Sequence, residues 1–141
     1  MSGKFFLDTN VFVYEFDTRE PEKSALAADL VRKAIATRSG VVSYQVVQEF
    51  FSVAFTRFLK PLPVHEAEHY LRTTFAPLLA VHSSPRLFLE AIRIRSVHRL
   101  SWYDSLIVAA ALEAGCEILY SEDFQAGRSL DGIKIKNPFA S

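Results

Sequence analysis

Four acidic side chains stand at positions where an α/β sheet gathers its ligands. Asp8 and Asp123 each follow a short apolar run that reads as a buried strand. Asp104 begins an Ala-rich helical segment, and Glu49 lies on a helix, six residues past Ser43 at the end of a second strand. Parallel strands of one sheet end on the same side, and the helices that follow them start there. The spacing therefore predicts that the four carboxylates meet along one edge of a sheet.

Carboxylates gathered in this way would do metal chemistry. They repel one another and raise each other's pKa, so a cation is needed to neutralise them. Oxygen ligands without a thiolate favour Mg²⁺ or Mn²⁺ over zinc. A site of this kind suits hydrolysis of a phosphodiester bond, and the four acids together indicate a metal-dependent nuclease.

Each acid also has a simpler explanation when it is taken alone. Asp8 and Asp104 could be N-caps of the helices that follow them, and Asp123 could be a turn residue. Glu49 alone would be an ordinary solvated helix residue. For any one Asp the cap or turn is the better interpretation, and only the joint placement on one edge favours a site.

Other polar residues are candidates to support or extend this site. Asn10 and Ser43 could orient Asp8, or equally serve as a helix cap and a strand-end hydroxyl. His65 and His69 lie four residues apart on a predicted helix, a spacing that can chelate a metal. No further ligand cluster accompanies them, so an exposed helix face is the favoured interpretation.

The elements that must position these side chains alternate between strand and helix. The predicted fold class is α/β, a three-layer αβα sandwich on a mostly parallel central sheet, with residues 1–141 forming a single domain. Apolar runs predict strands over residues 5–7, 41–43, 78–81, 117–120 and, as a final edge strand, 133–135. Helical spacing and helix-capping signals predict helices over residues 21–39, 44–59, 64–76, 85–100 and from 104 to about 114.

Composition limits the class of protein. Half of the residues are hydrophobic, so a packed core is expected, and 16 basic residues balance 16 acidic ones. The zero net charge removes any argument for a globally cationic nucleic-acid binder. Cys116 is the only cysteine, which fits a reducing cytoplasm. We expect neither a signal peptide nor a membrane span, because no uncharged stretch approaches the roughly 18 residues that a span requires.

Positive charge concentrates in the segment just before Asp104. Arg95 and Arg99 share a helix face at helical spacing and are the candidates to hold RNA phosphates. Arg93 is turned away from them and is the expected partner of Glu90. The segment could equally be a solvated helix with charge pairs. Two aromatic residues next to Asp104 could stack a base or pack in the core; they are Trp102 and Tyr103.

Four segments together resemble the PIN-domain ribonucleases, and most closely the VapC-type toxins of toxin–antitoxin pairs. The segments are Phe6-Leu7-Asp8-Thr9-Asn10, the stretch 43–49, the stretch 103–111 and Leu119-Tyr120-Ser121-Glu122-Asp123-Phe124. The Asp-Thr-Asn opening alone is a weak signal. The four segments in this order and spacing cover essentially the whole chain and are specific.

The resemblance implies a Mg²⁺- or Mn²⁺-dependent endoribonuclease. Asp8, Glu49, Asp104 and Asp123 fall on the four acidic positions of the family, with Asp8 and Asp104 the surest direct metal ligands. Ser121 stands where many members carry Thr, and it keeps the hydroxyl that supports the site. Asp123 rather than Glu122 takes the fourth position, because it lies two residues beyond that hydroxyl.

The resemblance also implies partners, namely an RNA substrate, a small cognate antitoxin and a second copy of the chain in a homodimer. The helices over residues 21–39 and 44–59 carry more Phe and Leu than one core face needs, which marks an interface; the surplus includes Phe55, Phe58 and Leu59.

Several alternatives to a toxin ribonuclease remain. A PIN-like RNA-binding module without a toxin role and a DNA or structure-specific nuclease would keep the fold. A haloacid-type phosphoaspartyl hydrolase would need an Asp two residues after Asp8, where Asn10 stands. A receiver domain would need a late strand-end Lys at the carboxyl edge, and no such Lys follows an apolar strand. Non-catalytic PIN-like modules typically lose acids, and all four are present here.

Overall fold

A central sheet organises the protein, whose computed structural model describes residues 3–140. Within that range six strands lie in the order β3-β2-β1-β4-β6-β5. All neighbouring strands are parallel except β5 and β6. The strands are Phe5–Leu7 (β1), Gly40–Ser43 (β2), Leu79–Val81 (β3), Ile118–Tyr120 (β4), Ser129–Leu130 (β5) and Ile133–Lys136 (β6).

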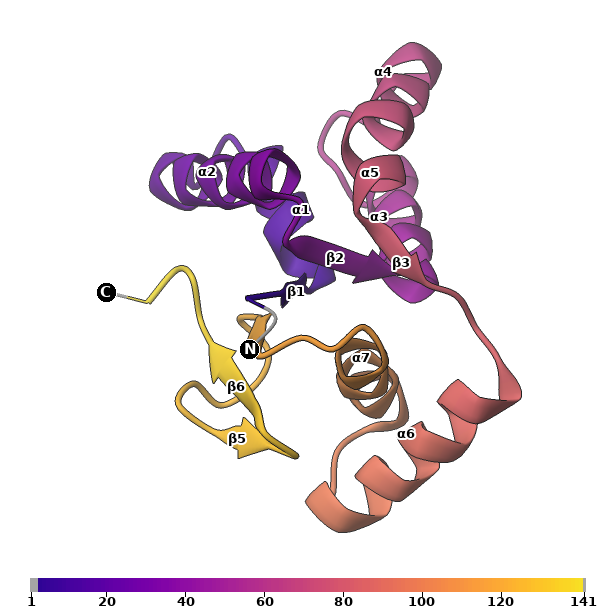
Figure 1. Cartoon of the computed structure of the whole chain (residues 1–141). Helices are drawn as coiled ribbons and strands as arrows, with labels where there is room; N and C mark the ends of the chain where they lie inside the picture. The colour runs from indigo at the N-terminus through magenta and orange to yellow at the C-terminus, as the bar shows by residue number, and fades with distance from the viewer. Residues whose placement is uncertain (1–2, 141) are drawn as a thin grey trace.

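Helices cover both faces of the sheet, so the fold is a three-layer α/β sandwich (Figure 1). One face carries Thr9–Glu15 (α1), Pro21–Thr37 (α2) and Tyr44–Thr56 (α3), and the other carries Pro85–His98 (α6) and Trp102–Glu113 (α7). Val64–Tyr70 (α4), the π-helical turn Leu71–Phe75 (η1) and Ala76–Leu78 (α5) form one helical run that leads into β3. No helix of residues 3–140 is long and apolar enough to cross a membrane.

The middle strands are buried on both sides, as a covered parallel sheet requires. All three residues of β1 and all four of β2 are buried. Helix α2 approaches β2 closely at Gly40. A Cβ atom on Gly40 would lie 2.2 Å from the Cβ of Ala34 and 3.2 Å from the ring of Phe5. The absence of a side chain at Gly40 therefore sets how near α2 lies to the sheet.

Aromatic rings fill the space between α1, α3 and the α4–η1 run. Phe50 of α3 lies at the centre, with ring centroids 5.0 Å from Tyr70, 5.2 Å from Phe75 and 5.7 Å from Phe16. Phe12 of α1 packs 4.8 Å from Phe75. These contacts fix α1 and α3 to each other, and the two helices carry residues of the candidate site.

The predicted strands and helices are confirmed in kind and order, apart from α1 and β5, which no predicted range covers, and from differences in the bounds of others. Helix α7 begins at Trp102 instead of Asp104, because Ser101 is the N-cap and its hydroxyl accepts a hydrogen bond from the Asp104 N–H. Helix α3 ends at Thr56 instead of residue 59, and the helix predicted over 64–76 contains the π-helical turn. Strand β6 is not the edge strand, because β5 pairs outside it.

Candidate active site

Asp8 lies at the carboxyl edge of the central strand and is buried, with 5% of its surface exposed. Its backbone N–H donates to the Tyr120 carbonyl of β4 at 3.0 Å. Its Oδ1 accepts from the Thr9 N–H at 2.7 Å, which makes Asp8 the N-cap of α1. Its Oδ2 accepts from the Ser121 hydroxyl at 2.7 Å. Asp8 is thus a helix cap and a member of the acidic edge at the same time.

The pKa of Asp8 is raised to about 7. Burial is the largest cause, the negative charges of Asp123 and Glu49 add to the rise, and the hydrogen bonds from Ser121 and Thr9 oppose it. The main cause is that water does not reach this carboxyl to solvate its charge, and the nearby like charges add to the effect. A buried carboxyl with so high a pKa gains strongly from a nearby cation.

Ser121 links Asp8 to Asp123 through hydrogen bonds of its hydroxyl. Its side chain is fully buried, donates to Asp8 and accepts from the Asp123 N–H at 3.1 Å. The hydroxyl thus holds the loop after β4 against the end of β1. This contact agrees with the supporting role that the resemblance implies for Ser121.

Glu49 and Asp104 complete the group from helices α3 and α7. Burial raises the pKa of Glu49, and the charges of Asp104 and Asp123 raise it further. Burial also raises the pKa of Asp104, with Asp123 again adding to the shift. Asp123 is exposed, and its negative charge helps to raise the pKa of each of the three other acids. The structure thus brings together the four carboxylates that the sequence analysis singled out.

Thr9 and Gln45, which were not among the predicted site residues, hold Glu49 in place. The Thr9 hydroxyl donates to Glu49 Oε1 at 3.2 Å. Gln45 also hydrogen-bonds to Glu49, and its side-chain amide donates to the Tyr103 carbonyl at 3.2 Å. Gln45 precedes Glu49 by four residues on α3, so helical spacing was a signal that could have found it.

Glu122 interacts with residues outside the group of four carboxylates. It accepts from the Tyr14 hydroxyl at 2.7 Å and from the Lys23 ammonium at 3.0 Å. Hydrogen bonds from these two donors lower the pKa of Glu122 despite its partial burial. Its neighbour Asp123 is therefore the acid of this loop that interacts with the other three.

Asn10 and Ser43 form no side-chain hydrogen bond with Asp8. Both polar atoms of the Asn10 amide and the Ser43 hydroxyl are buried, and within residues 3–140 none of them has a hydrogen-bond partner. The expectation that these two residues orient Asp8 has no support in the hydrogen bonds; Thr9 and Ser121 make those contacts. Buried polar atoms without partners usually mark a place that water, an ion or a ligand completes.

The donor set fits a hard divalent cation that keeps part of its water shell. All four acids offer carboxylate oxygen, and their mutual repulsion favours a positive ion among them. Within residues 3–140, no three Asp, Glu, His or Cys side chains converge tightly enough to enclose an ion by themselves. Mg²⁺ is usually held by one or two carboxylates together with several waters, so such a cage is not required.

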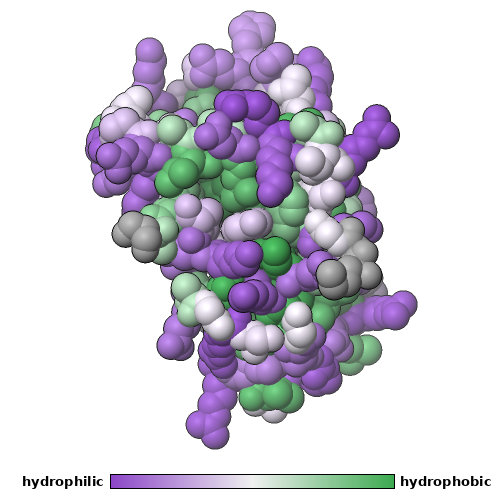
Figure 2. Space-filling model, turned by 60° about the vertical axis from the view of Figure 1, so that its left-hand side comes forward, coloured by the Kyte–Doolittle hydropathy of each residue, from purple (hydrophilic) through white to green (hydrophobic). Residues whose placement is uncertain are grey.

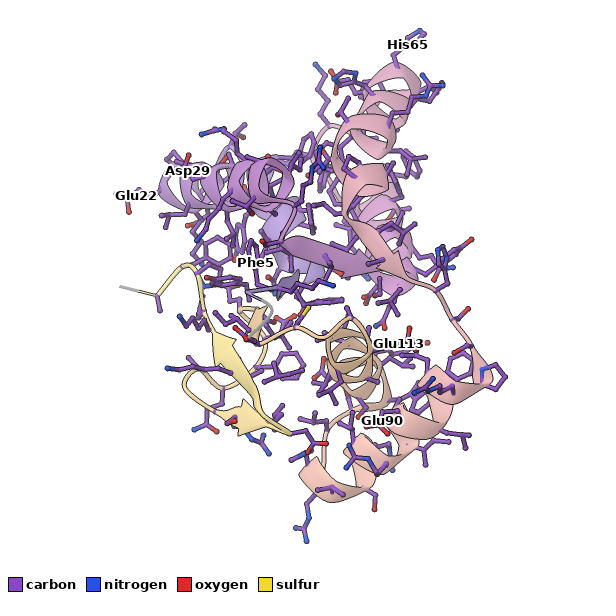
Figure 3. The ribbon with its side chains drawn as sticks, in the orientation of Figure 1. Phe5, Glu22, Asp29, His65, Glu90 and Glu113 are labelled. Atoms are coloured by element: carbon purple, nitrogen blue, oxygen red, sulfur yellow. The ribbon has the colours of Figure 1, made fainter. Side chains whose placement is uncertain are left out.

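His65 is remote from this edge. It lies at the far tip of α4, well away from Phe5 in the central strand (Figure 3). His65 and His69 are both exposed, which agrees with the interpretation of an exposed helix face.

The basic segment of α6 divides into paired and unpaired side chains. Arg93 pairs with Glu90, as the sequence analysis expected, and also with Asp131. His98 contacts Asp131 at 2.7 Å. Asp131 lies in the turn before β6, and since β6 runs parallel to β4, that turn lies at the opposite edge of the sheet from the carboxylates.

Arg95 and Arg99 are exposed, and in the described part of the chain neither side chain has an ion-pair partner. Arg99 does not continue the helix: it is the C-cap of α6, with a left-handed φ of 56°. Helical spacing therefore does not set its direction, and phosphate contact by these two residues stays a prediction.

Residues 5–128 match the family model of the PIN domain, and the chain belongs to that family. Comparison with curated proteins gives no significant match. Solved structures share the fold. A toxin–antitoxin complex from Klebsiella pneumoniae is 18% identical, with a TM-score of 0.65, and the match covers 96% of this chain and 98% of that one.

Two further structures are similar over most of their length. FitAcB from Neisseria gonorrhoeae has a TM-score of 0.64 at 16% identity, covering 96% of this chain and 98% of that one. The sarcin–ricin loop cleaving toxin VapC20 from Mycobacterium tuberculosis has a TM-score of 0.59 at 20% identity, covering 85% and 90%. At these identities the likeness is one of fold.

Proposed function

We propose that this chain is an endoribonuclease that depends on Mg²⁺ or Mn²⁺ and acts as the toxin of a toxin–antitoxin pair. The observation that carries the proposal is the electrostatic grouping of four carboxylates around buried Asp8. Such a grouping costs folding free energy without a cation, and it stands at the edge where α/β sheets bind ligands. The family and the similar toxin structures support the same conclusion.

The residues of the chain have distinct parts in this proposal. Asp8 and Asp104 would hold the ion directly, and Glu49 and Asp123 would bind it directly or through water. A bound divalent ion would neutralise these acids and stabilise the negative charge that develops on the phosphodiester. Thr9 and Gln45 fix Glu49, while Ser121 fixes Asp8 and the start of the Asp123 loop.

Metal removal tests the reaction. We expect the purified chain to cleave single-stranded RNA with Mg²⁺ or Mn²⁺ and to lose that activity in EDTA, with recovery when the ion is restored. Asp104→Asn should abolish cleavage and keep the fold by circular dichroism, while Asp29→Asn on the exposed face of α2 should cleave like the unchanged chain. Cleavage that persists in EDTA would rule out the metal mechanism.

The same assay separates the alternatives. Single-stranded DNA or duplex DNA cleaved in preference to RNA would identify a DNA or structure-specific nuclease. RNA that is bound with Mg²⁺ present and never cut would identify a binding module.

The protein partner that we propose is a small antitoxin, bound in an apolar groove between α1, α3 and α4. The groove has a volume of about 430 Å³ and is lined by apolar side chains that include Phe16, Val53 and Phe58, with Arg57 and Lys60 among the basic ones. An amphipathic segment with acidic side chains beside its apolar ones matches this lining.

Expression tests the toxin role. Production of the chain in bacteria should arrest growth, and co-production of the small protein encoded next to its gene should relieve the arrest. The Asp104→Asn variant should bind that small protein equally well and leave growth unaffected. Arrest by Asp104→Asn would show that toxicity does not come from the carboxylates.

A further inference from the structure

A small recess lies beside the carboxylates, on the other side of Gln45 and Tyr103. It has a volume of about 250 Å³ and forms where β2 and β3 end and where α3, α6 and α7 begin. Its lining includes Ser43, Tyr44, Gln48, His82, Phe88 and Tyr103. The volume falls below the roughly 300–1,000 Å³ of pockets for drug-sized ligands, so the recess suits one small planar group.

The recess shares a wall with the candidate active site. Gln45 lines it, hydrogen-bonds to Glu49 and donates to the Tyr103 carbonyl. Tyr103 also lines it and directly precedes Asp104. A ligand group in the recess would therefore sit one side chain away from two of the four acids.

The chemistry of the lining is aromatic and uncharged. The rings of Tyr44 and His82 lie 5.3 Å apart, and Tyr44 and Tyr103 expose 45% and 65% of their surface. As far as the chain is described, no Asp, Glu, Lys or Arg lines the recess. It is therefore unsuited to a phosphate and well suited to a flat ring that stacks on an aromatic side chain.

One buried polar atom points to a ligand with hydrogen-bonding edges. Ser43 is 3% exposed, lines the recess, and its hydroxyl has no hydrogen-bond partner in the described chain. Gln45 and Gln48 also line the recess. Amides and a hydroxyl around an aromatic slot are the groups that read the edge of an unpaired base.

We propose that this recess binds one unpaired nucleobase of the RNA, next to the phosphodiester that the carboxylates act on. Tyr44 stacks on the base, and the Ser43 hydroxyl completes its hydrogen bonding to the base edge. The inference rests on the proposed ribonuclease function and adds to it a recognition site that selects single-stranded RNA.

Binding of short RNA to two matched variants tests the site. Tyr44→Leu removes a half-exposed ring at the recess, and Phe55→Leu removes a ring of similar exposure (49%) further along the same helix. Both are made in the Asp104→Asn chain, so that bound RNA stays intact. The probes are fluorescent single-stranded homopolymers of each base and an abasic ribose-phosphate chain of the same length.

We expect Tyr44→Leu to weaken binding of at least one homopolymer by about tenfold, the size of effect expected for one lost base–aromatic stack. Binding of the abasic chain and the salt dependence should stay unchanged, because no phosphate contact is lost. Phe55→Leu should bind every probe as the parent does. Ser43→Ala should narrow the difference in affinity between the homopolymers.

Three results would overturn the base site. Equal affinities of Tyr44→Leu and Phe55→Leu for all probes would show that the recess does not contact RNA. An equal loss for the abasic chain would show that the effect is not on a base. A change from dimer to monomer in light scattering of Tyr44→Leu, with unchanged binding per chain, would assign the recess to an interface between copies. In each of these cases the unchanged chain, which keeps Asp104, still cleaves RNA. Failure of the proposed function would instead appear as the absence of cleavage by the unchanged chain.

Discussion

Asp8 shows how one side chain can serve local structure and chemistry together. An Asp at the N-cap accepts a hydrogen bond from the first turn of its helix. The same position, at the end of a central parallel strand, faces the edge where neighbouring strands and helices bring their own polar groups. A capping role and a catalytic role are therefore compatible, and evidence for the first does not count against the second.

The raised pKa of Asp8 makes the metal-free protein less stable as the pH rises. The carboxyl titrates near pH 7 in the folded protein and near pH 4 in the unfolded chain. Between these values the folded state binds the extra proton, so the free energy of unfolding falls from about pH 4 to about pH 7 and stays low above that. Asp8→Asn keeps an N-cap acceptor and removes this charge.

In EDTA at pH 8 we therefore expect Asp8→Asn to unfold at a higher denaturant concentration than the unchanged chain. The free energy of unfolding should be larger by an amount on the order of a few kcal/mol. At pH 4 the two should coincide. Urea titrations at the two pH values measure this, with Asp29→Asn as the control. A destabilised Asp8→Asn at both pH values would mean that the cap geometry outweighs the charge.

Arg93 and Arg95 of α6, together with its C-cap Arg99, allow a matched comparison of RNA contact and structural pairing. Replacing Arg95 and Arg99 with Ala should weaken RNA binding and reduce its salt dependence, because fewer counterions are released. Arg93→Ala breaks contacts with Glu90 and Asp131 instead, so it should lower thermal stability slightly and leave the salt dependence unchanged. RNA binding across a salt series measures both. The reverse pattern would remove Arg95 and Arg99 from the substrate site.

At the scale of elements, the contact between α2 and β2 depends on two small residues. Gly40→Ala should destabilise the protein by about 1–3 kcal/mol, because the new methyl group overlaps Ala34 and forces the helix outward. Adding Ala34→Gly removes the overlapping atom and should restore part of the lost free energy of unfolding. The restored part is reduced by the cost of placing a Gly in a helix. Denaturant unfolding of the single and double variants measures both effects. A Gly40→Ala variant as stable as the unchanged chain would contradict the close packing.

The sequence could predict the elements that have strong local signals. Short buried strands with acids behind them, Pro85 at the start of α6 and the apolar face of α3 were sufficient to predict their elements. It could not predict the two-residue strand β5, which exists only because the turn before β6 folds it back. The π-helical turn likewise has no local signal, since it lies within a continuous helical pattern.

At the scale of the molecule, several large apolar side chains remain on the surface, among them residues at the end of α3 and on α6. The face shown in Figure 2 is mainly hydrophilic, with hydrophobic side chains visible in hollows between the polar ones. Leu59 is 82% exposed beside the groove that we assign to the antitoxin, and Leu89 and Ile92 of α6 are 68% and 55% exposed. Exposed apolar surface of this kind marks interfaces.

We expect the chain to form a homodimer through α6. Light scattering at micromolar concentration should give about twice the mass of the 15.9 kDa chain. Leu89→Glu should return it to a monomer, and Leu59→Glu should leave the dimer intact while weakening antitoxin binding. A monomer in the unchanged chain would remove the dimer from the proposal. Loss of the dimer in Leu59→Glu alone would move the interface to the end of α3.

The grouping of the acids could be anticipated from topology, whereas their detailed support could not. Strand ends and helix starts predict that Asp8, Asp104 and Asp123 share an edge. The contacts of Thr9 with Glu49 and of Ser121 with Asp8 join residues 40 and 113 positions apart. Such contacts depend on how helices pack in three dimensions, which spacing along one chain does not reveal.

The pairing of β1 with β4 has a consequence for the synthesis of the protein. The ribosome makes Ser121 and Asp123 113 or more residues after Asp8, so a chain that ends between them lacks the hydroxyl and the last acid that complete the edge. Helix α1 can form early, but the carboxylates cannot assemble until the segment around β4 has emerged. The message being translated is thus exposed to the activity that we propose only after β4 and the loop that follows it have been made.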